Sequence, residues 1–492
     1  MWIFFIETIP SWVSISIGIL DLLVIISIVF LEKKNPRSII IWILLFLVIP
    51  FSGFFLYLMF GNGPKINRKK WSKNKAINDS NIHNKMDYGA FKLYPSAKEN
   101  NDIVKELIRL NEINHFPCTE NNKVDFYVDA KSLYADMLKD ISNAKKSINM
   151  MYYIFRNDRI GKEFIAAITK KAKEGIIVNL MYDASANKRI DKRNFKELIN
   201  AGGHVEAFFG TRLIILNLIN SSYRNHRKIT VIDGHISYVG GMNIGVEYLG
   251  EHKRITPWRD TSIRIEGDAS AMLQMRYLQD LASNSNKIDS NTYSNLISLN
   301  KLFFSKIQLK NISPVQIISS GPDTPSTEIK YCYQKMINSA THDVYLETPY
   351  FIPDLSFYDS IMLAQQSGIN VHLIIPGIYD HKMVYYVTLA NLEPLLKAGV
   401  KVYLYNGFIH SKMCVSDDIC ASIGTANLDM RSFELNFEVN AILYGKAEVA
   451  KSLDIIKKDI ENSKELTYEQ FKNRSRFEKI KEGFFRIFSP LM

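Results

Sequence analysis

The sequence contains few cysteines, and their spacing builds no recognisable site. Cys118, Cys332, Cys414 and Cys420 are scattered through the 492 residues without a C-x-x-C pair. This pattern excludes a disulfide framework and a zinc knuckle, and it suits a reducing compartment. We therefore expect all four cysteines to be packing residues.

The N-terminus lacks the marks of a removable signal peptide. No lysine or arginine precedes its first apolar run, and no small-residue cleavage site follows that run. Instead, two apolar runs at 12–31 and 38–60 are each long enough to cross a bilayer as a helix. The sequence therefore predicts a transmembrane hairpin within residues 1–62.

The basic residues around these runs predict an orientation. The formal net charge of +11 favours a polyanionic partner, either a membrane surface or nucleic acid. The loop between the runs carries fewer cations than the segment after them, so the positive-inside rule puts both termini and everything after Gly61 in the cytoplasm. Residues 63–104 are typical of a polar linker. The two groups of cations are Lys33, Lys34 and Arg37, and then Lys65, Arg68, Lys69, Lys70, Lys73 and Lys75.

One short motif, His-x-Lys-x-x-x-x-Asp, occurs twice, and each copy is followed in register by a glycine-led turn and an asparagine. A neutral imidazole can attack phosphorus, while lysine and asparagine can hold the phosphoryl oxygens. The glycines suit tight turns, because no helix follows a G-x-G-x-x-G pattern that would bind a nucleotide. The motif residues are His226, Lys228, Asp233 and Asn243 in the first copy, and His410, Lys412, Asp417 and Asn427 in the second.

The motifs belong to an internal repeat. Residues 147–158 align with 343–354, and the first copy contains a thirteen-residue insertion between 210 and 222. In each half, apolar runs typical of strands alternate with segments of helical periodicity, which indicates α/β layers with a largely parallel sheet and both motifs at one site. The expected strands are 147–154, 176–182, 343–348 and 370–376, and the expected helices are 161–173, 192–201, 356–366 and 384–397. We expect domains at 105–295 and 312–470.

The chain resembles the phospholipase D superfamily, and within it the bacterial cardiolipin synthases. The resemblance rests on both motifs and on Pro257-Trp-Arg-Asp-Thr261, Thr348-Pro-Tyr-Phe-Ile-Pro353 and Asn427-Leu-Asp-Met-Arg-Ser-Phe433. It implies two α/β/α phospholipase D-like domains in a pseudo-twofold repeat behind the hairpin, in a multi-pass protein of the bacterial cell membrane. It also implies transfer of a phosphatidyl group between two phosphatidylglycerol molecules, giving cardiolipin and glycerol, without a metal or cofactor.

The resemblance implies separate roles for the motif residues. His226 would be the nucleophile and His410 the acid and base, although a symmetric pair leaves the reverse assignment open. Lys228, Lys412, Asn243 and Asn427 would line the phosphate. Each histidine needs a carboxylate to fix its tautomer, which we expect to be Asp260 for the first and Glu438 for the second. Asp233 and Asp417 suit backbone capping at strand-ending turns.

Two segments are apolar enough to contact lipid. The insertion contains Leu213-Ile-Ile-Leu-Asn-Leu-Ile219, which suits either a lipid-facing patch or a buried helix. If it faces lipid, replacing Ile214, Ile215 and Leu218 by serine should lower activity on vesicles and spare soluble substrate. Residues 471–492 have the pattern of an amphipathic surface helix, although Gly483 weakens it.

Three functions fit the motifs: a lipid transferase, a membrane-tethered phospholipase D or nuclease, and a non-catalytic scaffold. The apolar segments favour the transferase. No interleaving of aromatic and basic residues suggests base stacking, so we expect no nucleic-acid partner. Both motifs are complete, which argues against a scaffold.

Overall fold

The computed structural model describes residues 91–187, 190, 192–209, 223–251, 254–284, 309, 313–324 and 326–486, with isolated helical positions between Ser16 and Leu45. Contacts divide the chain into two compact units. The larger unit comprises Trp71–Gly210 and Arg224–Pro490, and every element discussed below belongs to it.

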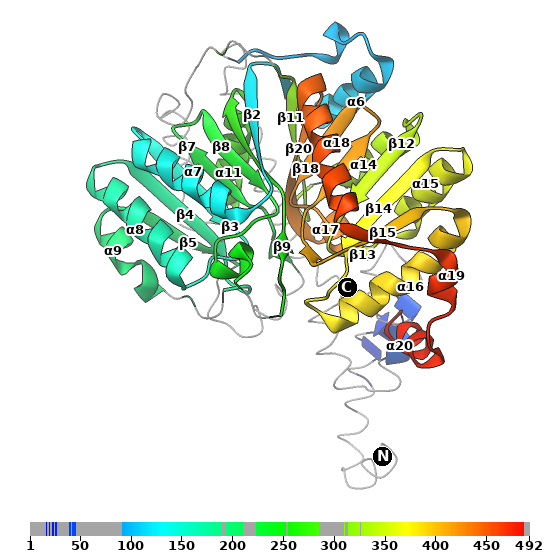
Figure 1. The fold of residues 1–492 in the computed structure, drawn as a ribbon. Helices are drawn as coiled ribbons and strands as arrows, with labels where there is room; N and C mark the ends of the chain where they lie inside the picture. The colour runs from blue at the N-terminus through cyan, green and yellow to red at the C-terminus, as the bar shows by residue number, and fades with distance from the viewer. Residues whose placement is uncertain are drawn as a thin grey trace. The chain divides into compact units, whose positions relative to one another are not determined.

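The first half of the repeat forms a seven-stranded sheet, seen in cyan and green in Figure 1. Its strands, in spatial order, are β2 (Asn122–Tyr127), β10 (Ser262–Gly267), β8 (Ile236–Gly240), β7 (Ile229–Ile232), β3 (Ser147–Tyr152), β4 (Ile177–Asp183) and β5 (His204–Phe208).

The second half forms a ten-stranded sheet, nine strands of which follow one path. They are β1 (Cys118–Thr119), β11 (Val315–Ser320), β20 (Asn436–Leu443), β18 (Cys420–Gly424), β17 (Met413–Ser416), β12 (Asp343–Glu347), β14 (Asn370–Pro376), β15 (Lys401–Tyr405) and β21 (Ser463–Leu466). The tenth, β6 (Arg224–Asn225), pairs with β20 beside that path.

Both sheets are mixed, so the expectation of a largely parallel sheet is wrong. Along the two strand paths, only β3–β4–β5 and β12–β14–β15 run parallel, and the strands that flank them are antiparallel to them. The reason is local: each motif strand, β7 or β17, returns through a hairpin to β8 or β18 instead of crossing over through a helix. Asp233 and Asp417 begin these hairpin turns with φ angles of 52° and 48°.

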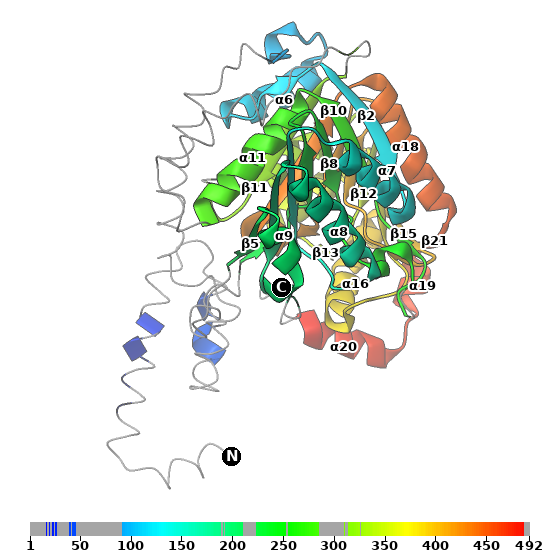
Figure 2. The same cartoon turned by 90° about the vertical axis from the view of Figure 1, so that its left-hand side faces the viewer.

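The helices form three layers around the two sheets. One outer face carries α7 (Ala130–Asn143), α8 (Arg159–Lys173) and α9 (Lys196–Asn200), visible in front in Figure 2. The opposite outer face carries α6 (Asp102–Ile113), α14 (Glu328–Asn338), α15 (Leu355–Gln366) and α16 (Lys382–Ala398). Between the sheets, α11 (Ala269–Asn284) and α18 (Lys446–Glu461) share one core with both inner faces.

Strand alternation explains why each sheet is covered on both faces. On β3, Ile148 and Met150 pack under α7 and α8, whereas Met151 points into the shared core. The shorter elements are η2 (Ser96–Lys98), η3 (Lys192–Phe195), η4 (Val246–Leu249), β9 (Trp258–Arg259), β13 (Phe351–Ile352), β16 (Phe408–Ile409), β19 (Leu428–Asp429), α17 (Met430–Glu434), α19 (Tyr468–Lys472) and α20 (Arg476–Arg486).

The strands and helices expected from periodicity are confirmed by β3, β4, β12, β14, α8, α9, α15 and α16. The start of the repeat differs from expectation. Helix α6 and strand β1 lie in the range expected for the first domain, yet they pack in the core and the sheet of the second half. Within the segment expected to be a linker, Leu93 already bridges to Thr119.

The four cysteines are buried and free, as expected for packing residues. Among the residues that the structure describes, we find no helix with the length and apolarity needed to cross a membrane. The expected hairpin spans fall almost entirely outside those residues, as do the 210–222 insertion and residues 487–492.

Candidate active site

Two short parallel strand pairs connect the halves immediately before the motif histidines. Arg224 and Asn225 of β6 pair with Asn436 and Phe437 of β20. In the equivalent pair, Phe408 and Ile409 of β16 pair with Trp258 and Arg259 of β9. Strand β9 lies between the halves in Figure 1. Continuing each register by one residue brings a motif histidine opposite a carboxylate of the other half of the repeat.

Each histidine is therefore bonded to a carboxylate of the opposite half. His226 Nδ1 lies 3.1 Å from Glu438 Oε1, and His410 Nδ1 lies 2.7 Å from Asp260 Oδ2. The expected residues are present, but their expected partners are exchanged, because β6 and β9 pair with strands of the opposite half. The exchange brings both motifs to one site, as the repeat predicts.

Nδ1 bonding to a carboxylate fixes the role of each ring. With its Nδ1–H donated to the carboxylate, a neutral histidine keeps its lone pair on Nε2. The side chains of His226 and His410 are 19% and 14% exposed, whereas both carboxylates are fully buried. The site thus offers two oriented imidazole nitrogens.

The two carboxylates are held in different ways. Glu438 accepts hydrogen bonds from the hydroxyls of Thr425 at 2.6 Å and Ser432 at 2.9 Å. Asp260 instead accepts the backbone N–H of Thr261 at 2.8 Å. A Cβ at Gly241 would collide with the Asp260 carboxylate, so the glycine-led turn of the first motif leaves room for it.

The two motif lysines are buried and crowd the same site. Burial lowers the pKa of Lys228 to about 8, against the opposing effect of Glu438 and Asp260. Burial and the nearby charge of Lys228 lower the pKa of Lys412 to about 7. An anion bound between them would stabilise the charged form of both lysines, so the site favours binding of an anion.

Burial lowers the pKa of both histidines. Burial, reinforced by Lys412, lowers the pKa of His410 to about 4, and the Lys412 Nζ lies 2.9 Å from its Nδ1. Burial lowers the pKa of His226 as well, and Glu438 opposes that fall as Asp260 does at His410. His226, Lys228 and Thr425 outweigh burial and hold the pKa of Glu438 below its usual range.

The motif aspartates cap the backbone where two strands begin. Asp233 accepts the N–H groups of Lys145, Lys146 and Ser147 at 2.9, 2.7 and 3.0 Å, where β3 begins. Asp417 accepts those of Thr341, His342 and Asp343 at 2.7, 2.9 and 2.7 Å, where β12 begins. These contacts match the expected structural role.

The two motif asparagines are engaged within their own halves. Asn243 accepts the N–H of Ile154 at 3.0 Å and donates to Tyr248 at 2.9 Å. Asn427 donates to Asp429 at 3.1 Å. The contacts described for these asparagines do not reach a motif histidine or lysine.

Sequence reasoning missed the buried groups behind the histidines. Arg227, between the motif histidine and lysine, is fully buried and binds both Asp280 oxygens at 2.7 Å. The Tyr153 ring lies 4.1 Å from that of His226, and the Trp258 ring lies 5.1 Å from that of His410. In the sequence, only the position of Arg227 between His226 and Lys228 indicated that this arginine lies close to the site.

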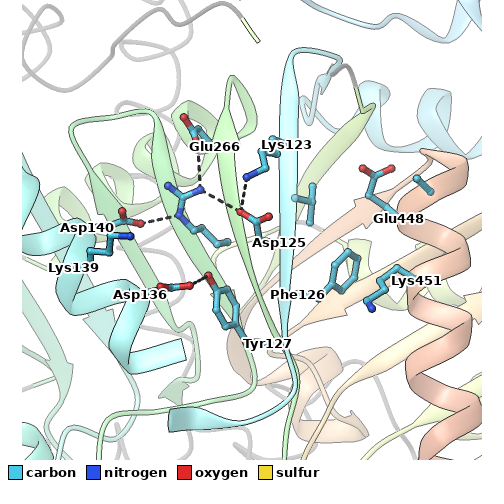
Figure 3. A pocket seen from close by; sticks show the side chains of 13 residues that line it. Lys123, Asp125, Phe126, Tyr127, Asp136, Lys139, Asp140, Glu266, Glu448 and Lys451 are labelled. Atoms are coloured by element: carbon cyan, nitrogen blue, oxygen red, sulfur yellow. Dashed lines mark hydrogen bonds and ion pairs between the residues drawn. The ribbon is translucent and has the colours of Figure 1, made fainter. Parts of the chain in front are cut away.

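A cavity of about 740 Å³ lies apart from the histidines, between β2, α7 and α18 (Figure 3). Its central cation, Arg264, already binds Asp140 at 2.7 Å, Asp125 at 3.3 Å and Glu266 at 3.0 Å. Because Arg264 is already bound by three carboxylates, it offers no free cation to a ligand, and we assign none to this cavity.

Comparison with known proteins identifies the family. Residues 137–253 and 333–460 match a family model described as "Cardiolipin synthase, PLD-like domain". Cardiolipin synthase 1 of Staphylococcus aureus strain COL is 42% identical, covering 98% of this chain and 97% of the relative. The chain belongs to the cardiolipin synthase family. Cardiolipin synthase 2 of Staphylococcus epidermidis is 40% identical, covering 97% of each chain.

Two further matches concern the fold and the N-terminus. A phosphatidylserine synthase structure from Haemophilus influenzae shares the fold, with a TM-score of 0.58 at 16% identity over 78% of this chain and 97% of that one. Residues 19–62 match a family model described as "Phospholipase_D-nuclease N-terminal". The family membership and the shared fold agree with two phospholipase D-like α/β domains.

Proposed function

We propose that this family member transfers a phosphatidyl group from one phosphatidylglycerol to a hydroxyl of a second, giving cardiolipin and glycerol. The observation that carries the proposal is the crossed pair of contacts, His226 with Glu438 and His410 with Asp260. It provides two oriented imidazoles and two lysines at one site, which suits in-line displacement at a phosphodiester. The names of the Staphylococcus relatives support the choice of substrate.

In the first step, Nε2 of His226 attacks phosphorus while protonated His410 delivers its proton to the leaving glycerol oxygen. The P–O bond breaks as a P–N bond forms, and glycerol departs. In the second step, His410 takes the proton of the incoming hydroxyl, whose oxygen attacks phosphorus and releases His226. Cardiolipin leaves with both histidines returned to their starting forms.

Lys228 and Lys412 neutralise the charge that develops on the phosphoryl oxygens. The asparagine amides add donors, since an NH₂ group carries two hydrogens and each makes one described hydrogen bond through its nitrogen. Bound phosphate also resolves an apparent conflict. A ring with a pKa of about 4 is neutral at pH 7, but an anion beside Lys412 raises that pKa and allows His410 to carry a proton.

The decisive assay supplies purified protein with phosphatidylglycerol vesicles and, separately, with single-stranded DNA. Cardiolipin with free glycerol supports the proposal; phosphatidic acid indicates a phospholipase D, and cleaved DNA a nuclease. His226→Ala and His410→Ala should each abolish turnover, whereas Ile113→Ser on the exposed end of α6 should not. A phosphatidyl adduct trapped on His410 instead of His226 would reverse the assignment.

We further propose that residues 12–31 and 38–60 anchor the protein with both termini in the cytoplasm. The match of residues 19–62 to an N-terminal family model supports an N-terminal module there. A cysteine at Asn35 should react with a membrane-impermeant maleimide in intact cells, whereas one at Asn74 should react only after permeabilisation. The native cysteines are buried and provide little background. Equal labelling at both positions contradicts the hairpin.

The C-terminal helix α20 supports contact with an anionic lipid surface. Its Phe485 ring stacks on Tyr386 of α16, with centroids 5.5 Å apart, and the two helices lie side by side in Figures 1 and 2. Phe477, Ile480 and Phe484 remain 66%, 68% and 56% exposed on one face. Four cations accompany this stripe: Arg476, Lys479, Lys481 and Arg486.

Changing these three apolar residues to serine should lower activity on vesicles severalfold while sparing a soluble short-chain substrate. Ile113→Ser is the matched control, because Ile113 is 68% exposed on a different helix. Equal loss on both substrates indicates a structural role for the stripe, and loss of a dimer in solution indicates a contact between copies. Either result contradicts lipid docking.

A further inference from the structure

Glu347 is a buried acid that the proposed reaction does not use. It ends β12, it is 1% exposed, and neither carboxylate oxygen accepts a hydrogen bond from a donor among the described residues. Isolated burial of a carboxylate is so costly that such a group becomes protonated. Burial, followed by the negative charge of Asp459, raises the pKa of Glu347 to about 8.

The groups around Glu347 connect it to His410. Arg259 of β9 binds Asp459 of α18 through two bonds of 2.9 and 2.6 Å. The same guanidinium donates to the main-chain oxygen of Asp260 at 2.5 Å and to the Thr261 hydroxyl at 2.8 Å. The Asp260 carboxylate then holds His410 at 2.7 Å.

One cation therefore faces two acids at this position. Asp459 occupies two of the Arg259 nitrogens, so Glu347 has no counter-ion of its own. The other polar groups near it are the Ser411 hydroxyl and the Asp260 carboxylate, and Tyr405 of β15 also lies within its electrostatic reach. Burial raises the pKa of Asp459 too, although Arg259 and Glu347 oppose that rise. One proton held between the Glu347 and Asp459 carboxyls leaves a single negative charge, which Arg259 can balance.

The first half of the repeat has no equivalent acid. In the repeat alignment, Glu347 corresponds to Met151, which is 1% exposed in the shared core. The buried cation near His226 is Arg227, and Asp280 compensates it with two bonds of 2.7 Å. The extra proton-carrying group is therefore specific to the side of His410.

We propose that Glu347 is a positioning residue for His410: as a carboxylic acid it donates its proton to Asp459, whose carboxylate holds Arg259 and thereby the Asp260 main chain. Loss of that proton adds a negative charge to a site that has no cation left to compensate it. The contacts from Asp459 to Arg259 and from Arg259 to the Asp260 main chain then weaken, and His410 loses its fixed orientation. The tests of this inference that measure turnover rest on the proposed function, whereas the test of protonation does not.

The test compares Glu347→Gln with Glu347→Met. Glutamine keeps the shape and donates a hydrogen bond to Asp459, so kcat at neutral pH should stay within about twofold of the unchanged protein. Methionine, the residue of the first half, removes the donor and should lower kcat about tenfold or more with little change in KM. Rescue by glutamine but not methionine separates donation from packing.

The pH profile on a soluble phosphodiester supplies a second readout. In the unchanged protein, turnover should fall as pH rises through about 8, where Glu347 loses its proton. Saturating substrate keeps Lys228 and Lys412 in their charged forms, so the alkaline limb of kcat reports Glu347, and it should move to higher pH in Glu347→Gln. An unchanged limb, or equal losses in both variants, overturns the proposal.

Infrared difference spectroscopy tests protonation without any turnover. The unchanged protein should show the C=O stretch of a buried carboxylic acid at neutral pH, which should disappear in alkali and be absent from Glu347→Gln. Persistence of that band in the variant contradicts the proposal. Because this measurement needs no substrate, it stands even if the lipid product differs from cardiolipin.

Discussion

The two histidine sites share one connection pattern but are held by different chemistry. In both, a two-residue parallel strand pair brings the histidine of one half against the carboxylate of the other. Two neutral hydroxyls hold Glu438 beneath His226, whereas Asp260 beneath His410 belongs to a network with Arg259, Asp459 and Glu347. The comparison teaches that equivalent orientation can arise from groups that do not titrate and from groups that do.

The sharpest test of the crossed pairing removes one carboxylate charge at a time. Glu438→Gln should impair His226 and slow formation of the phosphohistidine, whereas Asp260→Asn should impair His410, which acts in both steps, and slow the breakdown of the phosphohistidine as well as its formation. Each loss should be about 10²- to 10⁴-fold. Rapid-quench measurement of adduct and product distinguishes them, and accumulation of adduct in Glu438→Gln rather than Asp260→Asn would show that the roles are reversed.

The second test separates the two buried arginines by stability. Asp280→Ala removes the carboxylate that binds Arg227 and Arg276, both buried, and should cost about 3–5 kcal/mol of unfolding free energy. Asp459→Ala should cost less, because Glu347 can ionise and replace the lost charge beside Arg259. Urea unfolding measures the loss of unfolding free energy in both variants. The double variant Asp459→Ala, Glu347→Gln should lose as much as Asp280→Ala, because glutamine cannot ionise to replace the missing charge. Equal costs in the single variants contradict this difference between the sites.

The third test concerns the lysines and pH. Their pKa values of about 7 and about 8 lie below the usual lysine value, so the ammonium charges are present at lower pH and are lost as pH rises through this range. Affinity for dimethyl phosphate, whose own charge is constant there, should fall up to about tenfold per pH unit above 7. Calorimetry in buffers of different ionisation enthalpy should detect proton uptake on binding. In Lys412→Met, the remaining decline should begin nearer pH 8.

The smallest expected effect comes from the hydroxyl beneath Glu438. Thr425→Val keeps the side-chain volume but removes a donor, which should cost about 0.5–1.5 kcal/mol and lower kcat severalfold. It should also move the acid limb of the pH profile upward, because Glu438 loses a group that keeps its pKa low. Thr169→Val in α8 is the matched control, because the Thr169 hydroxyl is buried and makes no hydrogen bond among the described residues. A Thr425→Val protein with an unchanged acid limb would show that this hydroxyl does not tune the first site.

Local patterns predicted much of the architecture because their causes are local. Alternation and helical periodicity identified β3, β4, β12 and β14 and the helices beside them. The motif aspartates stood where short apolar runs end, and their carboxylates cap the N–H groups at the starts of β3 and β12. The mixed sheets escaped prediction, since a short apolar run looks the same in a parallel and an antiparallel strand.

Partner choice could not be read from the repeat. Both candidate carboxylates were visible, but the family resemblance assigned each one to the histidine of its own half. The strands that exchange them, β6 and β9, contain only two residues each and have no periodic signal of their own. Glu347 was hidden for a related reason: in the sequence it is one polar residue at the end of an apolar strand, and its isolation from any counter-ion depends on α18 and β9.

The sequence by itself determined the chemistry on offer: two imidazoles, two lysines and two carboxylates in a repeated frame, because residue types and short spacings need no tertiary information. The tertiary structure alone decided which carboxylate serves which histidine and how each is held. Those contacts join residues 150 and 212 positions apart, and only the packing of the two halves fixes the register between them.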